Sequence, residues 1–156
     1  MAEQMVTHLL SKLVISSEMT VLDGYCGVGL FSAFLAEQCG RLIGIESSSS
    51  ACTDFIVNLD EFDHVELYEA SLEAVLPQIT DHVDVVVLDP PRAGLTPSAL
   101  EGILRLQAPS LAYISCDPAT LARDCKKILA GGYQLKQITL IDVFPQTYHI
   151  ESISLW

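Results

Sequence analysis

A cysteine directly before a predicted helix is the first feature of the sequence that suggests chemistry. In Ser115-Cys116-Asp117-Pro118 a thiol stands at the end of a predicted strand, and a proline begins the following helix. The helix dipole favours negative charge at that end, and the thiolate is the reactive form of cysteine. Cys116 is therefore a candidate nucleophile. From position alone, an inert buried thiol remains the alternative, and Cys26 is the nearest competitor.

Two further segments bring charged side chains to the ends of apolar runs. Asp89-Pro90-Pro91-Arg92-Ala93-Gly94 follows the run 85–88. Its two prolines predict that the chain leaves the sheet in a rigid, extended conformation, with Asp89 and Arg92 at the sheet edge. A structural ion pair is the alternative there. The segment 144–152 contains Tyr148, His149 and Glu151, a density typical of a site. Equally, these side chains could share one face of an edge strand.

A glycine-rich turn follows the first predicted strand. Asp23-Gly24-Tyr25-Cys26-Gly27-Val28-Gly29 allows a close approach of the backbone to a ligand, and Glu46 ends the next strand, where a carboxylate can accept hydrogen bonds from a ribose diol. Ser32 stands where a dinucleotide fold would need its third glycine. The spacing is more similar to D-x-x-x-G-x-G, the loop that holds S-adenosylmethionine in methyltransferases. A tight turn without ligand is the alternative, as is a helix cap for Glu46.

Strand-like and helix-like segments alternate along the chain and would position these residues. Strands are predicted at 20–23, 41–45, 65–68, 83–88 and 111–115, with helices at 2–15, 30–38, 49–59, 71–76, 97–106 and 118–130. Alternation predicts an α/β fold with a parallel sheet covered on both faces. Segments 133–143 and 149–156 are too close for a parallel return, so they predict an antiparallel hairpin. This is the plan of Rossmann-like methyltransferases.

Composition limits the possible functions. The 156 residues fit one domain, 1–156, and 8 basic against 20 acidic residues give a net charge of -12, which argues against unaided binding of nucleic acid. Five cysteines without a C-x-x-C pair predict neither a disulfide framework nor a zinc site. No apolar run is long enough for a membrane span and no signal peptide is visible, so we expect a soluble cytoplasmic chain.

Taken together, the strings LDGYCGVGLF, GIE, DPPRAG, ISCDPATLARD and FPQTYHIES resemble the RNA uracil-C5 methyltransferase family. The resemblance extends from Val21 to Trp156. It implies S-adenosylmethionine as cofactor, held by Asp23, Tyr25, Gly27, Gly29, Glu46 and Asp89. Ser71, after the third strand, departs from the Asp that often contacts the adenine in this family.

The resemblance also implies a mechanism. The Cys116 thiolate would add to C6 of a uracil and make C5 nucleophilic toward the cofactor's methyl group, and Glu151 would then remove the C5 proton. Asp89 would orient the uracil, and Arg92 would help to hold the site.

Family members are longer, so the resemblance implies that an N-terminal RNA-binding domain and a central domain are absent from this chain. The RNA substrate, rRNA or tRNA, would then be bound through the full-length protein, without membrane or metal. Two alternatives are a cofactor-binding module without catalysis, which need not keep Cys116 and Glu151, and a small-molecule methyltransferase. A nicotinamide oxidoreductase is a further alternative, but this sequence lacks the third glycine that its dinucleotide-binding loop would need.

Overall fold

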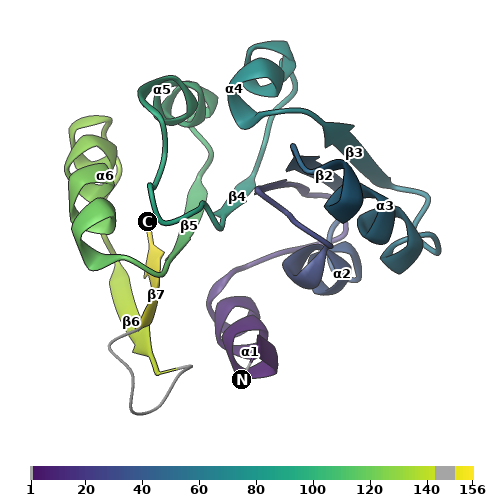
Figure 1. Cartoon of the computed structure of the whole chain (residues 1–156), viewed down its shortest axis with the longest axis horizontal. Helices are drawn as coiled ribbons and strands as arrows, with labels where there is room; N and C mark the ends of the chain where they lie inside the picture. The colour runs from purple at the N-terminus through teal and green to yellow at the C-terminus, as the bar shows by residue number, and fades with distance from the viewer. Residues whose placement is uncertain (1, 143–149) are drawn as a thin grey trace.

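The computed structural model describes residues 2–142 and 150–156, which build a seven-stranded sheet between two layers of helices (Figure 1). The strand order is β3-β2-β1-β4-β5-β7-β6; β1 to β5 are parallel, and β7 runs antiparallel to both of its neighbours. The strands are β1 Thr20–Gly24, β2 Arg41–Glu46, β3 Val65–Glu69, β4 Val85–Leu88, β5 Ser110–Ser115, β6 Gln137–Ile141 and β7 Glu151–Leu155.

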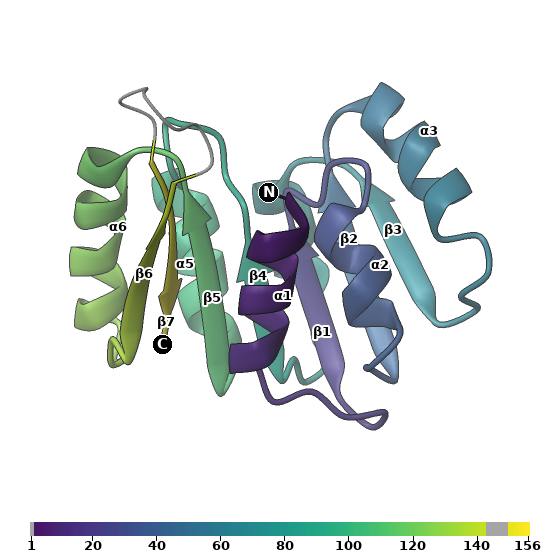
Figure 2. The same ribbon diagram turned by 90° about the horizontal axis from the view of Figure 1, so that it is seen from below.

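Helices cover both faces of the sheet (Figures 1 and 2). On one face lie α1 Ala2–Lys12, α2 Leu30–Ala36 and α3 Ser49–Asn58; on the other lie α4 Leu72–Val75, which a 3-10 turn at Leu76–Gln78 continues, α5 Pro97–Leu106 and α6 Pro118–Ala130. The two longest helices of the second layer begin as their sequences predict. Thr96 and Asp117 accept hydrogen bonds from backbone N–H groups of the first turns, and a proline follows each cap.

The core forms on both faces because successive strand residues point in opposite directions. In β1, Val21 packs against α1 and α2, whereas Leu22 packs toward α4 and α5; both are fully buried. All four residues of β4 are buried as well. Central parallel strands of this kind are apolar along their whole length, which is why the run 85–88 carries no polar alternation.

The predicted elements agree with the structure apart from their ends and one insertion. The first helix ends at Lys12 rather than at residue 15, and the strand predicted from Val83 begins at Val85. The last two strands pair antiparallel as predicted, but they are shorter, because Tyr133 still bonds back to Ile128 at the end of α6. The sequence did not indicate that β7 inserts between β5 and β6. No helix in the described part of the chain could span a membrane.

Candidate active site

The glycine loop between β1 and α2 bends back over the end of β2. The backbone N–H groups of Tyr25 and Cys26 both donate to the Ile45 carbonyl, at 2.9 and 3.1 Å, and Tyr25 and Gly27 take positive φ angles of 63° and 54°. Nothing lies within 4 Å of the position a Cβ would occupy on Gly27. This open space beside the backbone is what a ligand-binding loop requires.

Gly29 serves packing rather than ligand approach. Its φ is 90°, and a Cβ there would lie 2.5 Å from Cδ1 of Leu59 and 3.1 Å from Cδ2 of Phe55. The missing side chain lets α3 approach the start of α2. The absence of a side chain therefore has a different structural reason at Gly27, where it leaves open space, than at Gly29, where it permits close packing.

Glu46 fixes the glycine loop from the end of β2. Its Oε2 accepts a hydrogen bond from the Gly27 N–H at 3.0 Å, and its Oε1 accepts one from the Ser48 N–H at 2.7 Å. A carboxylate has about four acceptor positions, so capacity for a ligand hydroxyl remains. The structure thus brings two predicted cofactor residues, Glu46 and Gly27, into direct contact.

Asp23 lies buried under the same loop. One of its oxygens accepts a hydrogen bond from Ser32 Oγ at 2.5 Å, while Oδ1 has no partner within the described part of the chain. The pKa of Asp23 is raised to about 7, chiefly because burial desolvates the carboxylate; the Ser32 hydrogen bond lowers it, and the nearby carboxylates of Asp89 and Glu46 raise it to a smaller extent. Ser32, which argued against a dinucleotide site, therefore has a role here that the sequence analysis missed.

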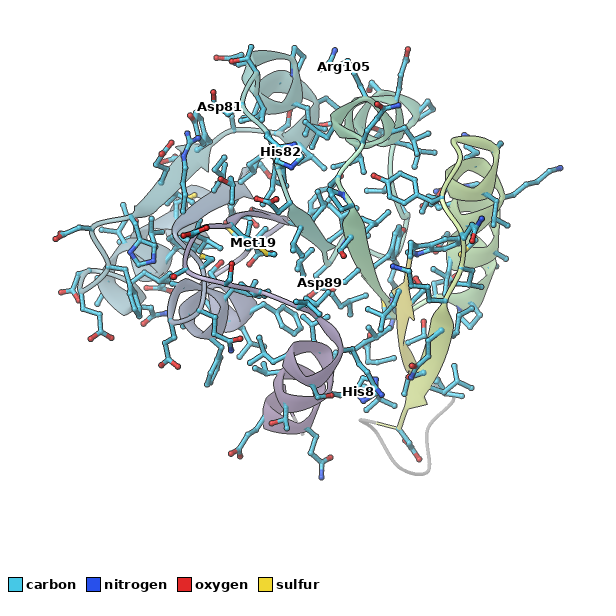
Figure 3. All side chains as sticks on the ribbon, turned by 180° about the vertical axis from the view of Figure 1, so that it is seen from behind. His8, Met19, Asp81, His82, Asp89 and Arg105 are labelled. Carbon is cyan, nitrogen blue, oxygen red and sulfur yellow. The ribbon has the colours of Figure 1, made fainter. Side chains whose placement is uncertain are left out.

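Asp89 extends this acidic cluster toward the centre of the sheet. Its backbone N–H donates to the Gly24 carbonyl at 3.2 Å, which ties it to the end of β1. The side chain keeps contact with solvent, yet the surrounding protein desolvates it enough, together with Glu151 nearby, to raise its pKa to about 6. In Figure 3 Asp89 lies near the middle of the molecule, whereas Asp81 and Arg105 lie toward its rim.

A cavity of about 240 Å³ opens beside these residues. Its wall is built by the ends of β1 and β2, the start of α4 and the loop after β4, through Tyr25, Ile45, Glu46, Ser47, Ala70, Ser71, Leu72, Glu73, Pro91, Ala93, Gly94 and Thr96. Ser71 therefore lies in the wall, although its residue type departs from the family pattern. The cavity occupies the carboxyl edge of the parallel strands, where doubly wound sheets bind ligands.

Cys116 lies between the end of β5 and the first turn of α6. Ser115 Oγ and the Asp117 backbone exchange two hydrogen bonds, and Asp117 Oδ1 accepts from the N–H groups of Ala119 and Thr120, both at 2.9 Å. These contacts order the turn on which Cys116 sits half-buried. Cys26, the competing thiol, is buried, and desolvation raises its pKa well above its usual range. Cys26 is thus held as an unreactive thiol.

The register of β5 and β7 brings Glu151 beside Cys116. Ser115 and Ser152 form the last pair of this antiparallel ladder, and Cys116 and Glu151 each lie one residue farther toward the same edge of the sheet. The influence of Glu151 on Asp89 shows that these two carboxyl groups are also close. Tyr148 and His149, predicted in the same cluster, lie outside the described residues.

The loop after β4 is held by residues that the sequence analysis quoted only as part of a motif. Arg123 and Asp124 of α6 bond to its backbone at Ala93 and Leu95. Arg92 influences Asp117 at the start of α6, whose pKa is lowered mainly by the Thr120 backbone and in part by the Arg92 charge. The structure therefore gathers Asp89, Arg92, Cys116 and Glu151 around the ends of β4, β5 and β7.

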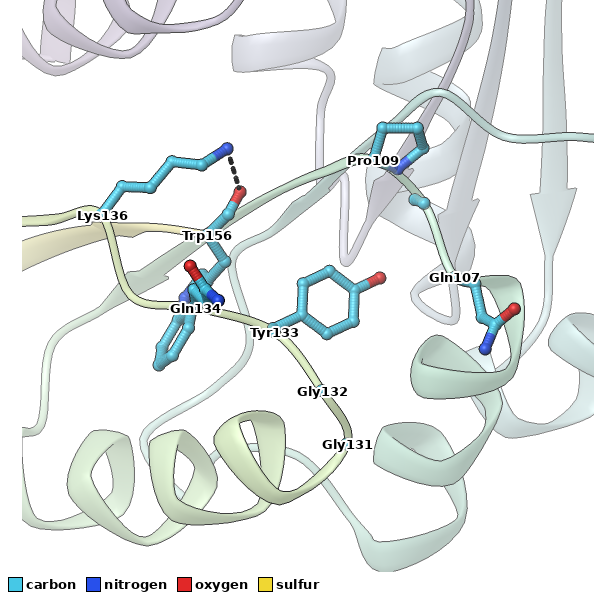
Figure 4. Close-up of a pocket in the computed structure, with 9 residues that line it drawn as sticks. Gln107, Pro109, Gly131, Gly132, Tyr133, Gln134, Lys136 and Trp156 are labelled. Atoms are coloured by element: carbon cyan, nitrogen blue, oxygen red, sulfur yellow. Dashed lines mark hydrogen bonds between the residues drawn. The ribbon is translucent and has the colours of Figure 1, made fainter.

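A larger hollow, of about 370 Å³, lies at the opposite edge of the sheet (Figure 4). It is lined by Gln107, Ala108, Pro109, Gly131, Gly132, Tyr133, Gln134, Lys136 and Trp156. Its one drawn hydrogen bond runs from Lys136 Nζ to the Trp156 backbone oxygen, at 3.3 Å. None of the predicted site residues contributes to this wall. Of the predicted site residues, Tyr25 and Glu46 line the smaller cavity.

Known proteins are similar to this chain along nearly its whole length. The family model described as tRNA (uracil-5-)-methyltransferase matches residues 1–156. A Streptomyces coelicolor protein named "uncharacterized RNA methyltransferase" is 40% identical over 158 residues, covering 99% of this chain and 34% of that protein. The 23S rRNA (uracil(1939)-C(5))-methyltransferase RlmD of Shewanella halifaxensis is 39% identical over 158 residues, covering 99% and 35%.

Among solved structures, a Pyrococcus abyssi tRNA (uracil-54, C5)-methyltransferase in complex with S-adenosyl-L-homocysteine superposes with a TM-score of 0.83 at 30% identity, covering 99% of this chain and 37% of that one. The expected methyltransferase fold is thereby confirmed. The chain spans about a third of the length of these relatives. On the family model and these similarities, the chain belongs to the tRNA (uracil-5-)-methyltransferase family.

Proposed function

We propose that the chain is the catalytic domain of an enzyme that transfers a methyl group from S-adenosylmethionine to C5 of a uridine in rRNA or tRNA. The single observation that carries the proposal is the register of β5 and β7, which sets a half-buried thiol, Cys116, beside a carboxylate, Glu151. A domain that only bound the cofactor would need neither residue at that place. The named activities of the relatives support the same reaction.

The residues around the 240 Å³ cavity fit a positively charged nucleoside cofactor. Glu46 lies in the cavity wall, the buried Asp23 interacts electrostatically with it and with Asp89, and Asp23 Oδ1 has no hydrogen-bond partner among the residues described. Gly27 leaves the loop backbone open, and Glu46 can still accept from a ribose hydroxyl. S-adenosylmethionine, when bound, supplies a methyl group activated by its sulfonium charge. A cluster of carboxylates favours that cation.

Cys116 and Glu151 then divide the reaction at the uracil. The Cys116 thiolate forms a bond to C6, the C5–C6 double bond opens, and its electron pair makes C5 the nucleophile that takes the methyl group. Glu151 removes the proton that C5 still carries, the double bond re-forms, and the bond from sulfur to C6 breaks to release the thiolate. Asp89 and Arg92 flank the pair and position the base. A stacked uridine must first leave its helix.

A trapping experiment tests the assignment of the nucleophile. An RNA with 5-fluorouridine at the target position should stay covalently attached to the protein, because fluorine cannot leave C5 as a proton does. The assay uses the chain joined to the remaining two thirds of a relative, with S-adenosylmethionine present, and a denaturing gel as readout. Cys116→Ala should abolish the adduct. The matched control Cys26→Ala should retain it.

Glu151→Gln separates the two steps of the proposed reaction. Addition and methylation proceed in this variant, but no base takes the C5 proton, so unmodified uridine RNA itself should accumulate as a methylated adduct. An adduct that survives Cys116→Ala would falsify the nucleophile. Cofactor binding without any adduct or methyl transfer would favour a non-catalytic module, and methylation of free uracil compounds alone would favour a small-molecule enzyme.

A further inference from the structure

Asp124, in the middle of α6, is a fully buried carboxylate with an unusual set of donors. Its Oδ2 accepts from the Leu95 backbone N–H at 2.9 Å and from the Tyr113 hydroxyl at 2.8 Å, and its Oδ1 accepts from Arg123 Nε at 2.9 Å. Burying a carboxylate costs free energy unless such donors compensate it. Because the three donors come from a loop, a strand and a helix, Asp124 joins three separate segments at one point.

Arg123 completes the attachment of the segment 89–95, here termed the proline loop. Its Nη2 donates to the Ala93 carbonyl at 2.9 Å and to the Leu95 carbonyl at 3.2 Å. Together with the Leu95 N–H bond to Asp124, three backbone groups of the proline loop are held by two neighbouring side chains of α6. The loop passes over the end of β5 toward α6 in Figure 2.

Gly94 shows how closely helix and loop approach. Its φ is 71°, its N–H donates to the Pro91 carbonyl at 2.8 Å, and a Cβ at this position would lie 2.5 Å from Asp124 Oδ2 and 2.6 Å from Arg123 Nη2. Any side chain would force the two charged groups away. The tight turn from Pro91 to Gly94 and the pair on α6 are therefore one fitted arrangement.

The proline loop has two functional contacts. Pro91, Ala93 and Gly94 form part of the wall of the 240 Å³ cavity, and the loop carries Arg92, whose charge acts on Asp117 next to Cys116. We propose that Arg123 and Asp124 are positioning residues, which clamp the proline loop to the helix that begins after Cys116. The clamp would hold two features in place relative to Cys116: Arg92, and the part of the 240 Å³ cavity wall that the proline loop forms, here termed the cofactor wall. This inference rests on the proposed function.

Arg123→Gln and Lys127→Gln make a matched pair of variants of the 156-residue chain. Both remove one positive charge from an exposed position of α6, but of these two side chains it is Arg123 that bonds to the proline loop. Amide hydrogen exchange at Gly94 and Leu95 reports the clamp directly. Loss of two to three hydrogen bonds should speed local exchange about tenfold in Arg123→Gln. Lys127→Gln should exchange as the parent does, and equal exchange in the two variants would overturn the clamp.

Calorimetry with S-adenosylhomocysteine tests the link to the cofactor wall, at a temperature where urea titration shows each variant to be folded. Arg123→Gln should weaken binding about fivefold to tenfold, Arg123→Lys should recover part of that loss, and Lys127→Gln should bind as the parent does. A lower stability with unchanged affinity would mean a merely structural role and would overturn the proposal. Tyr113→Phe, which removes one donor to Asp124 and keeps the ring, is a second perturbation of the clamp and should also weaken binding.

The two readouts separate this proposal from the proposed function. If the parent chain itself does not bind S-adenosylhomocysteine, the assigned cofactor is wrong, while exchange at Leu95 still decides whether the clamp exists. In the longer fusion protein, Arg123→Gln should slow adduct formation with 5-fluorouridine RNA about tenfold at saturating RNA, with the RNA affinity unchanged. A loss of RNA affinity at an unchanged rate would contradict the positioning role.

Discussion

Replacing Asp23 by asparagine should stabilise the fold at alkaline pH while weakening cofactor binding. The amide introduced by Asp23→Asn matches the shape of the protonated carboxyl group and can still accept the Ser32 hydrogen bond, but it carries no charge. In the parent chain the ionised carboxylate is buried beside Asp89 and Glu46. The substitution therefore removes mainly the cost of burying a charged carboxylate, and in smaller part its repulsion by Asp89 and Glu46, neither of which the unfolded chain bears.

The size of the effect follows from the two pKa values. Burial raises the pKa of Asp23 from 3.8 to about 7 in the folded protein. The folded state then holds the proton more tightly than the unfolded chain, which binds fewer protons between these values, so the free energy of unfolding falls as pH rises through this window. Three pKa units correspond to about 4 kcal/mol, most of it lost by pH 8.

Urea titrations of both proteins from pH 4 to pH 8 measure this difference. The free energy of unfolding of Asp23→Asn minus that of the parent should rise along the series by up to about 4 kcal/mol, while calorimetry at pH 8 should show weaker binding of S-adenosylmethionine to the variant. Taking the difference cancels the contributions of titrating groups that do not interact with Asp23, whereas its coupling to Asp89 and Glu46 is part of the measured effect. A difference that stays flat, or that falls with pH, would refute the assignment of a raised pKa to buried Asp23.

Three further outcomes are expected. Gly29→Ala should lower the free energy of unfolding by about 2 kcal/mol or more, because its Cβ would meet Leu59. Gly27→Ala should lower it by only about 1 kcal/mol. Urea titration measures both values, and equal losses would contradict the distinction between the two glycines. Glu46→Ala should weaken S-adenosylhomocysteine binding severalfold by calorimetry, since the Gly27 and Ser48 N–H groups lose their acceptor; unchanged heat would remove Glu46 from the cofactor site. With a net charge of -12, the 156 residues alone should not bind RNA in a filter assay, and joining them to the rest of a relative should restore binding that weakens steeply with salt.

Much of the fold was predictable because its local signals agree with one another. The helices at Pro97–Leu106 and Pro118–Ala130 have the predicted bounds, since in each a capping residue and a proline mark the first turn. The order of the last strands was not predictable. Chain proximity requires β6 and β7 to pair, but nothing local says which of them lies next to β5.

The positions of the candidate site residues in the fold were predictable to a similar degree, while their roles stay predictions. Strand ends indicated Asp23, Glu46, Asp89 and Cys116, because parallel strands present their carboxyl ends at one edge. Glu151 was assigned by resemblance, and only the register of β5 with β7 explains its position. Asp124 was missed because a carboxylate in the middle of a predicted helix is usually solvated. Its buried position depends on hydrogen bonds from Tyr113 and Leu95, which are distant in sequence.

The insertion of β7 between β5 and β6 also bears on the order of folding. The parallel strands β1 to β5 can assemble from residues 20–115, which already contain the glycine loop, Glu46 and Asp89. The carboxylate proposed to remove the C5 proton arrives only when a later segment enters the sheet and separates β6 from β5. During synthesis, therefore, the cavity proposed to hold the cofactor is complete before Cys116 and Glu151, the pair proposed to be catalytic, come together. A nascent chain that stops short of residue 151 is then expected to bind S-adenosylmethionine without transferring its methyl group.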